Sequence, residues 1–236
     1  MPNTYFRFRQ FTVHQEKTAM KVCTDACLFG AWIASFVKDR KIERVLDVGA
    51  GTGLLSLMIA QVSSARIDAV EIEDGAFLQA TENFDASPWA ERLKAHHTDI
   101  AHYHPGEMYD LIVSNPPFYE NDLLSDDEQR NIALHSSKLE FVQLLEISGR
   151  LTNESGQLAI LIPYRRAKDL EEKISRSPFS ASIKVNVRQT PKHQYFRCMY
   201  LLSKAPAGET DETEITIKSG DKYTEQFYSL LKDYYL

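Results

Sequence analysis

The chain has 236 residues, 43% of them hydrophobic and 25% charged, which is enough for one substantial domain with a packed core. No apolar stretch approaches the roughly 20 residues of a membrane span, and the N-terminus alternates phenylalanine with arginine where a signal peptide would be apolar. The formal net charge of −6 argues against a protein that binds polyanions through its total charge.

Residues 1–43 are expected to form a strand and a helix ahead of the main fold. Phenylalanine and arginine alternate over residues 6–9, which is a strand pattern. Further along, Thr24 followed by Asp25 and an apolar run predicts the N-terminus of a helix.

The cysteines and histidines predict neither disulfides nor a metal site. Cys23 and Cys27 are spaced to share one face of a helix, and Cys198 lies in a predicted buried strand. We expect all three to be reduced packing residues of a cytoplasmic protein. His102 and His104 are close together, but no further ligands accompany them, so no metal is expected.

A strand, a glycine-rich loop and a helix follow one another in the next segment. Residues 44–48 predict a short buried strand, Gly49-Ala50-Gly51-Thr52-Gly53 form the loop, and residues 54–60 predict the helix. This order is the nucleotide-binding first unit of a doubly wound fold. The glycines allow a tight turn and let a ligand lie against the backbone.

Two residues narrow the choice of ligand. Leu54 occupies the place where the dinucleotide fingerprint needs Gly or Ala, and the loop lacks the Lys-Ser/Thr ending of a P-loop. The carboxylate of Asp47 beside the turn would repel a pyrophosphate. It suits a ligand that carries an ammonium and a sulfonium group, as S-adenosylmethionine does.

Acidic residues end the next two predicted strands. Glu71 follows strand 66–70 and lies 18 residues after Gly53 (71 − 53 = 18), near the spacing at which an acidic side chain takes ribose hydroxyls. Asp99 follows strand 93–97, where its carboxylate could accept a hydrogen bond from an adenine amino group.

Asn115-Pro116-Pro117-Phe118 follows the apolar strand 111–113 and predicts the site of chemistry. Asparagine supplies a side-chain carbonyl acceptor, and proline supplies a carbonyl on a rigid backbone. Phe118 offers a flat face for a ring. Acceptors on the hydrogens of a planar amino group favour a pyramidal nitrogen, whose localised lone pair can attack an electrophile. The same residues also suit a plain strand-end turn.

The rest of the chain completes a predicted α/β fold. Beyond the motif we expect helices over residues 139–151 and 165–175, a strand over 156–162 stopped by proline, and an antiparallel strand pair, 183–187 and 196–202. The fold class is therefore a doubly wound, mostly parallel, Rossmann-like seven-stranded sheet with an antiparallel C-terminal strand pair.

Composition changes after Ala205. A linker, an edge strand over residues 214–218 and a helix over 223–235 are predicted there. We accordingly expect three parts: an N-terminal segment 1–43 that packs on the ligand pocket, a core 44–204, and an extension 205–236.

Together these motifs identify a family. The glycine loop with Asp47, then Glu71, Asp99 and residues 115–118, resembles the class I S-adenosylmethionine-dependent amino-methyltransferases. The segments Phe11-Thr12-Val13-His14-Gln15 and Met20-Lys21-Val22-Cys23-Thr24-Asp25 resemble the opening of the bacterial tRNA(Val) adenine-37 N6-methyltransferases. The resemblance covers roughly residues 5–204.

The resemblance implies S-adenosylmethionine as cofactor, tRNA as partner, and methyl transfer to N6 of adenine-37, without a metal, in a cytoplasmic protein for which a monomer is favoured. In that family the opening segment helps to close the cofactor pocket. The expected catalytic residues are Asn115, Pro116, Pro117 and Phe118. The expected cofactor-binding residues are Lys21, Thr24, Asp47, Gly49, Ala50, Gly51, Gly53, Glu71, Ile72, Asp99, Ile100 and Asn115.

Other functions fit the same motifs. The Asn-Pro-Pro-aromatic loop also suits guanine N2 in rRNA or the amide nitrogen of a glutamine in a protein. A non-catalytic protein that kept the cofactor pocket is the alternative from a different class.

The distribution of charge suggests where RNA would bind. Five basic residues and no acidic ones occur over residues 184–204, whereas acidic residues are concentrated over 120–128 and in the predicted linker 209–214. Because electrostatic steering depends on the local field, we expect RNA to bind near residues 184–197 and the N-terminus. The expected RNA contacts are Arg7, Arg9, Lys184, Arg188, Lys192 and Arg197.

Overall fold

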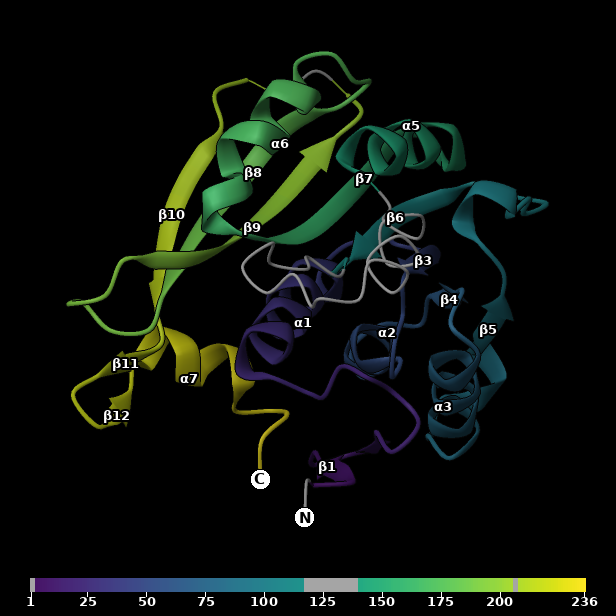
Figure 1. Cartoon of the computed structure of the whole chain (residues 1–236), viewed down its shortest axis with the longest axis horizontal. Coiled ribbons are helices and arrows are strands. Elements are labelled where there is room, and N and C mark those ends of the chain that lie inside the picture. The colour runs from purple at the N-terminus through teal and green to yellow at the C-terminus, as the bar shows by residue number, and fades with distance from the viewer. Residues whose placement is uncertain (1–2, 117–139, 206–207) are drawn as a thin grey trace, which may run out of the picture.

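The computed structural model describes residues 3–116, 140–205 and 208–236, and most of these build one mixed sheet with helices on both faces (Figure 1). The strands of this sheet are β3 (Arg44–Val48), β4 (Arg66–Glu71), β5 (Leu93–His97), β6 (Tyr109–Ser114), β7 (Thr152–Pro163), β8 (Ser180–Arg188), β9 (Tyr195–Ser203) and β10 (Asp211–Thr216). The helices are α1 (Thr24–Lys38), α2 (Leu54–Ala60), α3 (Asp74–Asp85), α5 (Phe141–Leu151), α6 (Ala167–Ile174) and α7 (Glu225–Leu231), with short 3-10 helices η1 (Ala90–Arg92), η2 (Ile100–His102) and η3 (Tyr164–Arg166). Two small hairpins complete the description: β1 (Tyr5–Arg7) with β2 (Thr12–His14), and β11 (Lys218–Ser219) with β12 (Lys222–Tyr223).

The strand order is β10-β8-β9-β7-β6-β3-β4-β5. Strands β5, β4, β3, β6 and β7 run parallel, and β9 runs antiparallel to both β7 and β8. The predicted α/β class and its antiparallel pair are therefore confirmed. The sheet has one strand more than the seven predicted, because β10 adds to its edge in parallel with β8. This strand overlaps the edge strand predicted over residues 214–218 and begins three residues earlier.

The central strands are buried on both faces, as parallel strands between two helical layers must be. Leu46 on β3 and the run Leu111, Ile112 and Val113 on β6 have no exposed surface. Because side chains alternate along a strand, Leu46 and Ile112 join the core under α5 and α6, whereas Leu111 and Val113 join the core under α1 and α2.

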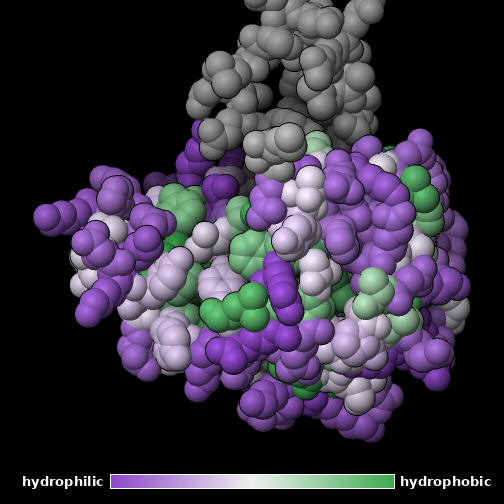
Figure 2. Space-filling model, turned by 90° about the horizontal axis from the view of Figure 1, so that it is seen from below, coloured by the Kyte–Doolittle hydropathy of each residue, from purple (hydrophilic) through white to green (hydrophobic). Residues whose placement is uncertain are grey.

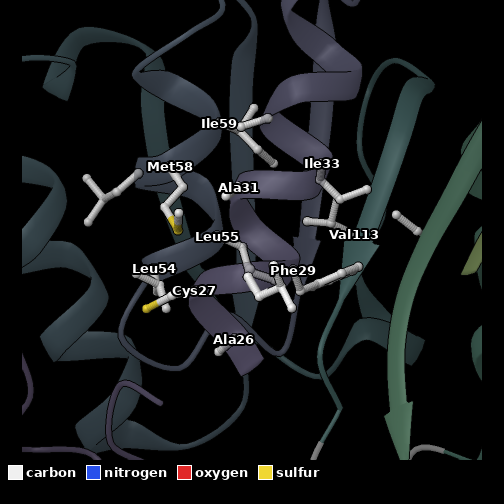
Figure 3. Close-up of a cluster of buried hydrophobic side chains, with 14 of the residues drawn as sticks. Ala26, Cys27, Phe29, Ala31, Ile33, Leu54, Leu55, Met58, Ile59 and Val113 are labelled. Atoms are coloured by element: carbon white, nitrogen blue, oxygen red, sulfur yellow. The ribbon is translucent and has the colours of Figure 1, made fainter. Parts of the chain in front are cut away.

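The core under α1 and α2 is formed by close packing of these two helices (Figure 3). Gly30 permits the contact, since a Cβ at this position would lie 2.5 Å from the sulfur of Met58. Figure 3 shows Phe29 and Ile33 of α1 beside Val113, so the same helix that packs on α2 also covers the centre of the sheet.

The two described ends of the chain meet beside α2. The backbone N–H of Arg9 donates to the carbonyl of Tyr234 at 2.9 Å, and the hydroxyl of Tyr234 donates to the carbonyl of Met58 at 3.0 Å. The side-chain amide of Gln61 donates to the carbonyl of Asp233 at 2.9 Å. The labels N and C accordingly lie close together in Figure 1.

Three sequence-based expectations differ from the structure near the C-terminus and in α1. The acidic segment expected to be a solvated linker contributes Glu212 and Glu214 to β10. The predicted helix 223–235 is shorter, because Tyr223 belongs to β12 and α7 ends at Leu231. Cys23 is exposed, although Cys27 and Cys198 are buried as expected. Of the helices in the described ranges, none has the length and apolar character needed to cross a membrane.

The glycine at the start of α2 yields a test of the packing. Gly53 has φ +78°, and a Cβ there would lie 2.4 Å from the ring of Phe84, whereas Gly49 has φ +72° but open space around the equivalent position. Both alanine variants incur the cost of a positive φ, about 1 kcal/mol. Gly53→Ala should lose a further ~1–3 kcal/mol through overpacking.

Urea denaturation of the two variants measures this difference. Equal midpoints for Gly53→Ala and Gly49→Ala would show that Phe84 does not constrain Gly53.

Candidate functional site

Eight of the site residues predicted from sequence gather at the edge of the sheet where the parallel strands end. Strands β3, β4, β5 and β6 are parallel, so their carboxyl ends meet there, which is where ligands bind in open α/β sheets. A cavity of about 580 Å³ opens at this edge. The predicted residues that line it are Gly49, Gly51, Glu71, Ile72, Asp99, Ile100, Asn115 and Pro116.

Glu71 is the best anchored of these side chains. One carboxylate oxygen accepts a hydrogen bond from the backbone N–H of Gly51 at 2.8 Å. The other accepts from the N–H groups of Ile72 at 2.8 Å and Glu73 at 3.0 Å. These three hydrogen bonds fix the side chain in place. Because each carboxylate oxygen has more than one acceptor position, Glu71 can still accept hydrogen bonds from the hydroxyls of a ligand.

The floor of the cavity beside Glu71 is shaped by the glycine loop. Gly49 and Gly51 both have positive φ, and a Cβ at either position would meet no atom within 4 Å. The backbone therefore faces open space that a ligand can fill.

A second carboxylate and two isoleucines form the part of the cavity nearest β5. Asp99 caps η2 by accepting from the N–H of Ala101 at 2.9 Å. Ile100 is buried and Ile72 is about half exposed, at 53%. Two apolar side chains next to an acceptor suit a flat heteroaromatic ring that carries an amino group.

Asn115 and Pro116 lie where β6 ends, in the same cavity. The hydroxyl of Ser114 donates to the carbonyl of Val48 at 2.9 Å, which ties the end of β6 to the strand that carries the glycine loop. Asn115 is half-buried and Pro116 is buried. The other two predicted catalytic residues, Pro117 and Phe118, lie outside the described residues.

Asp47, which was expected beside the ligand, is not among the residues that line the cavity. It is fully buried, and one oxygen accepts from the N–H of Ser56 at 3.2 Å and from its hydroxyl at 2.8 Å. The other oxygen has no hydrogen-bond partner. Consecutive side chains of a strand point to opposite faces of the sheet. Val48 lines the cavity, so the side chain of Asp47 points to the other face.

The N-terminal segment supplies Thr18, Ala19 and Met20 to the cavity. The sequence did not single out Thr18 and Ala19, and it indicated Met20 only as part of the segment that carries the family resemblance. Lys21, which was expected there, does not line the cavity and donates from Nζ to the carbonyls of Gln15 and Thr18. Thr24 is the first residue of α1 and does not line the cavity. Ala50 and Gly53 are likewise absent from its lining.

Two buried amides of α3 hold this N-terminal segment in place. Asn83 accepts from the N–H of His14 and donates to the carbonyls of His14 and Thr52, all at 2.9 Å. Gln79 accepts from the N–H of Lys17 at 3.1 Å. Asn83 thus joins the N-terminal segment to the glycine loop through one side chain.

Helix α5 also reaches the cavity through Gln143 and Ile147, which the sequence did not indicate. Their spacing of four places both on one face of the helix. That spacing is compatible with any packed face, so it could not have identified them as cavity residues.

Most of the basic residues expected to contact RNA have partners within the chain. Lys184 pairs with Glu171 at 3.0 Å and with Glu212 at 3.2 Å. Arg188 pairs with Glu214 on β10.

Two further cations of the expected set are also engaged. Arg197 pairs with Asp25 at 2.7 Å, and the side chain of Arg9 donates to the carbonyl of Tyr235 at 2.6 Å. Lys192 and Arg7 are exposed, and within the described ranges neither forms an ion pair. The expected basic surface at 184–197 is therefore largely neutralised, since acids distant in sequence fold against it.

Comparison with known proteins gives consistent matches. A family model described as "Methyltransferase small domain" matches residues 30–153. A Parabacteroides distasonis protein named tRNA1(Val) (adenine(37)-N6)-methyltransferase is 38% identical over 100% of this chain and 99% of its own length. A Dyadobacter fermentans protein of the same name is 40% identical over 99% and 98%.

Among solved structures, a predicted O-methyltransferase from Agrobacterium tumefaciens has a TM-score of 0.70 at 15% identity, covering 89% of this chain and 96% of that one. At this identity the likeness concerns the fold. It supports the doubly wound arrangement described above.

The buried carboxyl of Asp47 leads to a test in pH. Burial raises the pKa of Asp47 to about 7, against about 4 for an unfolded chain. The native state therefore keeps the proton while the unfolded state loses it, and this group's contribution to stability falls as pH rises from 4 to 7. Asparagine does not titrate, so the Asp47→Asn variant should lack this loss of stability. The free energy of unfolding of the variant minus that of the unchanged protein should therefore rise by about a few kcal/mol between pH 4 and pH 7.

Urea unfolding at several pH values measures the effect. Asparagine can still accept from Ser56, whereas Asp47→Ala cannot and should be less stable than Asp47→Asn at every pH. A stability difference between Asp47→Asn and the unchanged protein that does not vary with pH would contradict the assignment.

Proposed function

The chain belongs to the methyltransferase small domain family, and we propose that it transfers a methyl group from S-adenosylmethionine to N6 of adenine-37 in tRNA1(Val). Relatives that match nearly the whole chain carry this activity in their names. The observation that carries the proposal is that Asn115 and Pro116 line the same cavity as Glu71 and the glycine loop. An amino group held by Asn115 would therefore lie next to the bound cofactor.

The cavity fits S-adenosylmethionine in size and in chemistry. Its volume lies within the range of ligand pockets, roughly 300–1,000 Å³. Glu71 would accept from the ribose hydroxyls, and Asp99 would accept from the adenine amino group between Ile72 and Ile100. Gly49 and Gly51 provide the open backbone against which the cofactor would lie.

The cofactor supplies an electrophilic methyl group on a sulfonium centre. The chain's own task is to present the nitrogen. We propose that the side-chain carbonyl of Asn115 and the backbone carbonyl of Pro116 accept from the two hydrogens of the target amino group. These contacts favour a pyramidal nitrogen and are strongest in the transition state, which is the condition for catalysis by differential binding.

No dedicated general base is needed in this scheme. Once the nitrogen has attacked, it is cationic and strongly acidic, so its proton passes readily to solvent. Pro117 and Phe118 stay proposed members of the catalytic loop, with Phe118 stacking on the target base. Gln143 and Ile147 of α5 line the cavity and are proposed to limit its width.

We propose that the protein acts as a cytoplasmic monomer without a metal, in the three parts 1–43, 44–204 and 205–236. The free cysteines suit a reducing compartment. On the face shown in Figure 2, hydrophobic atoms form small patches separated by hydrophilic ones. Broad apolar patches mark interfaces, and this face presents none among the described residues.

One assay tests the proposed function. The protein is incubated with labelled S-adenosylmethionine and, separately, with tRNA, rRNA, DNA or bulk protein, and the modified product is identified by mass spectrometry. We expect N6-methyladenosine in tRNA1(Val), and none in a transcript with guanine at position 37. Methylation of a guanine in rRNA or of a glutamine in protein would contradict the proposed substrate. Binding of the cofactor without methyl transfer to any of these substrates would favour a non-catalytic role.

Substitution of Asn115 tests the chemistry. Asn115→Ala removes a polar contact made mainly in the transition state, and loss of one such preorganised contact typically costs ~10²-fold or more in kcat. Single-turnover methylation measures the rate, and calorimetry measures cofactor binding, which should fall only modestly. A variant that methylates tRNA at a nearly unchanged rate would remove Asn115 from the mechanism.

Substitution of Glu71 tests the cofactor site. A ligand that binds only the native state raises the thermal midpoint by mass action, so S-adenosylmethionine should stabilise the unchanged protein. Glu71→Ala should reduce this shift, because hydrogen bonds to the ribose are lost. Glu146→Ala, an exposed glutamate of α5 outside the cavity, serves as the control.

The midpoint without ligand is measured for each variant, because Glu71 also holds Gly51. Stabilisation by NAD in place of S-adenosylmethionine would overturn the assignment of the cofactor.

A further inference from the structure

An exposed tyrosine stands beyond the candidate site at the same edge of the sheet. Tyr164 directly follows β7 and is 39% exposed. Its ring lies against that of Tyr195, the first residue of β9, with centroids 5.2 Å apart and planes at 47°. Tyr164 is thus the outward-facing member of an aromatic pair.

The inner ring of this pair is held from two sides. The hydroxyl of Tyr195 donates to Glu214 on β10. The guanidinium of Arg188 lies over the Tyr195 ring, 5.6 Å from its centroid, and pairs with the same Glu214. Arg188, which the sequence predicted as an RNA contact, therefore supports the aromatic pair through contacts at the protein surface.

Strand register gives the position of Tyr164 relative to the catalytic loop. Ser114 on β6 is paired with Ile160 on β7, so Asn115 lies one residue beyond this level and Tyr164 lies four. At ~3.3 Å per residue, the tyrosine is about 10 Å further out along the strands. Tyr164 does not line the cavity that holds Asn115. A base that stacks on it would therefore be a neighbour of the base whose amino group Asn115 is proposed to hold.

Two exposed lysines lie close in the chain to the aromatic pair: Lys192 precedes Tyr195 by three residues, and Lys168 follows Tyr164 by four. Lys192, in the loop between β8 and β9 that projects at the left of Figure 1, and Lys168, in the first turn of α6, are both exposed. Neither forms an ion pair within the described ranges. Surfaces for single-stranded nucleic acid combine aromatic side chains with cations that follow the backbone, and the segments on either side of the aromatic pair supply both.

We propose that Tyr164, supported by Tyr195, is a stacking platform for an RNA base adjacent to the target adenine, and that Lys192 contacts the neighbouring phosphate. The inference rests on the proposed function, which requires a single-stranded loop at the site. Sequence-specific RNA recognition targets such loops, whose unstacked bases stack on aromatic side chains. The basic cluster predicted at 184–197 is replaced in this account by one aromatic contact and one cation.

The test compares binding of an anticodon stem-loop RNA to Tyr164→Ala, Tyr164→Phe, Lys192→Ala and the control Tyr228→Ala, an exposed tyrosine of α7. Fluorescence anisotropy gives Kd over a range of KCl concentrations. Tyr164→Ala should bind about 10-fold more weakly with an unchanged salt slope, because a lost stack releases no counterions. Tyr164→Phe and Tyr228→Ala should bind as the unchanged protein does, and Lys192→Ala should reduce the salt slope by ~0.7.

Methylation kinetics separate this inference from the proposed function. Tyr164→Ala should raise the KM for RNA and leave kcat at saturating RNA unchanged, with the same thermal shift by S-adenosylmethionine as a check of folding. If the unchanged protein methylates tRNA and Tyr164→Ala has the same KM, the platform is wrong and the function stands. A Tyr164→Phe variant as weak as Tyr164→Ala also overturns stacking, and an unchanged protein that neither binds nor methylates RNA overturns both proposals.

Discussion

The carboxylate of Glu71 connects two neighbouring parallel strands at the edge where the cavity opens. It accepts from Gly51 in the loop after β3 and from the two residues that follow its own strand. Without this acceptor, three backbone N–H groups at the rim of the cavity would lose their partners, and such groups are costly to leave unpaired when buried. The open face of the glycine loop, the position of Ile72 and the start of α3 all depend on these bonds.

A single side chain, that of Asn83, likewise joins the N-terminal segment to this edge. Asn83 bonds the backbone of His14 and also the carbonyl of Thr52 in the glycine loop, so Thr18 and Met20 are placed by the helix that follows Glu71. Residues that line one cavity thus come from the N-terminal segment, four strand ends, η2, α3 and α5. Ion pairs hold the two outermost strands together at the side of the sheet away from β5, where Glu212 and Glu214 of β10 pair with Lys184 and Arg188 of β8.

The parts of the fold that depend on short-range patterns could be predicted from the sequence. Strands 44–48 and 93–97 and helix 54–60 occur with the predicted bounds. For strand 44–48 and helix 54–60, hydrophobic runs on either side of the glycine loop determine these bounds locally. What could not be predicted depends on which face a side chain takes or on distant partners. Asp47 lies on strand β3 as expected, but its side chain is buried and does not line the cavity. Arg197 pairs with Asp25, 172 residues away, and no local pattern reveals such a bond.

The contacts between the described ends of the chain have a consequence for synthesis on the ribosome. Met58 of helix α2 accepts a hydrogen bond from the hydroxyl of Tyr234, and Gln61 at the end of this helix donates to the carbonyl of Asp233. Strand β10 completes the edge of the sheet nearly as late in the chain. When strands β3 to β9 have emerged from the ribosome, part of α2 and the edge of β8 are therefore still exposed. Unpaired strand edges and exposed apolar surface make such partly folded chains prone to misassembly. For this protein the vulnerable interval in translation lies between the emergence of residue 203 and that of residue 235.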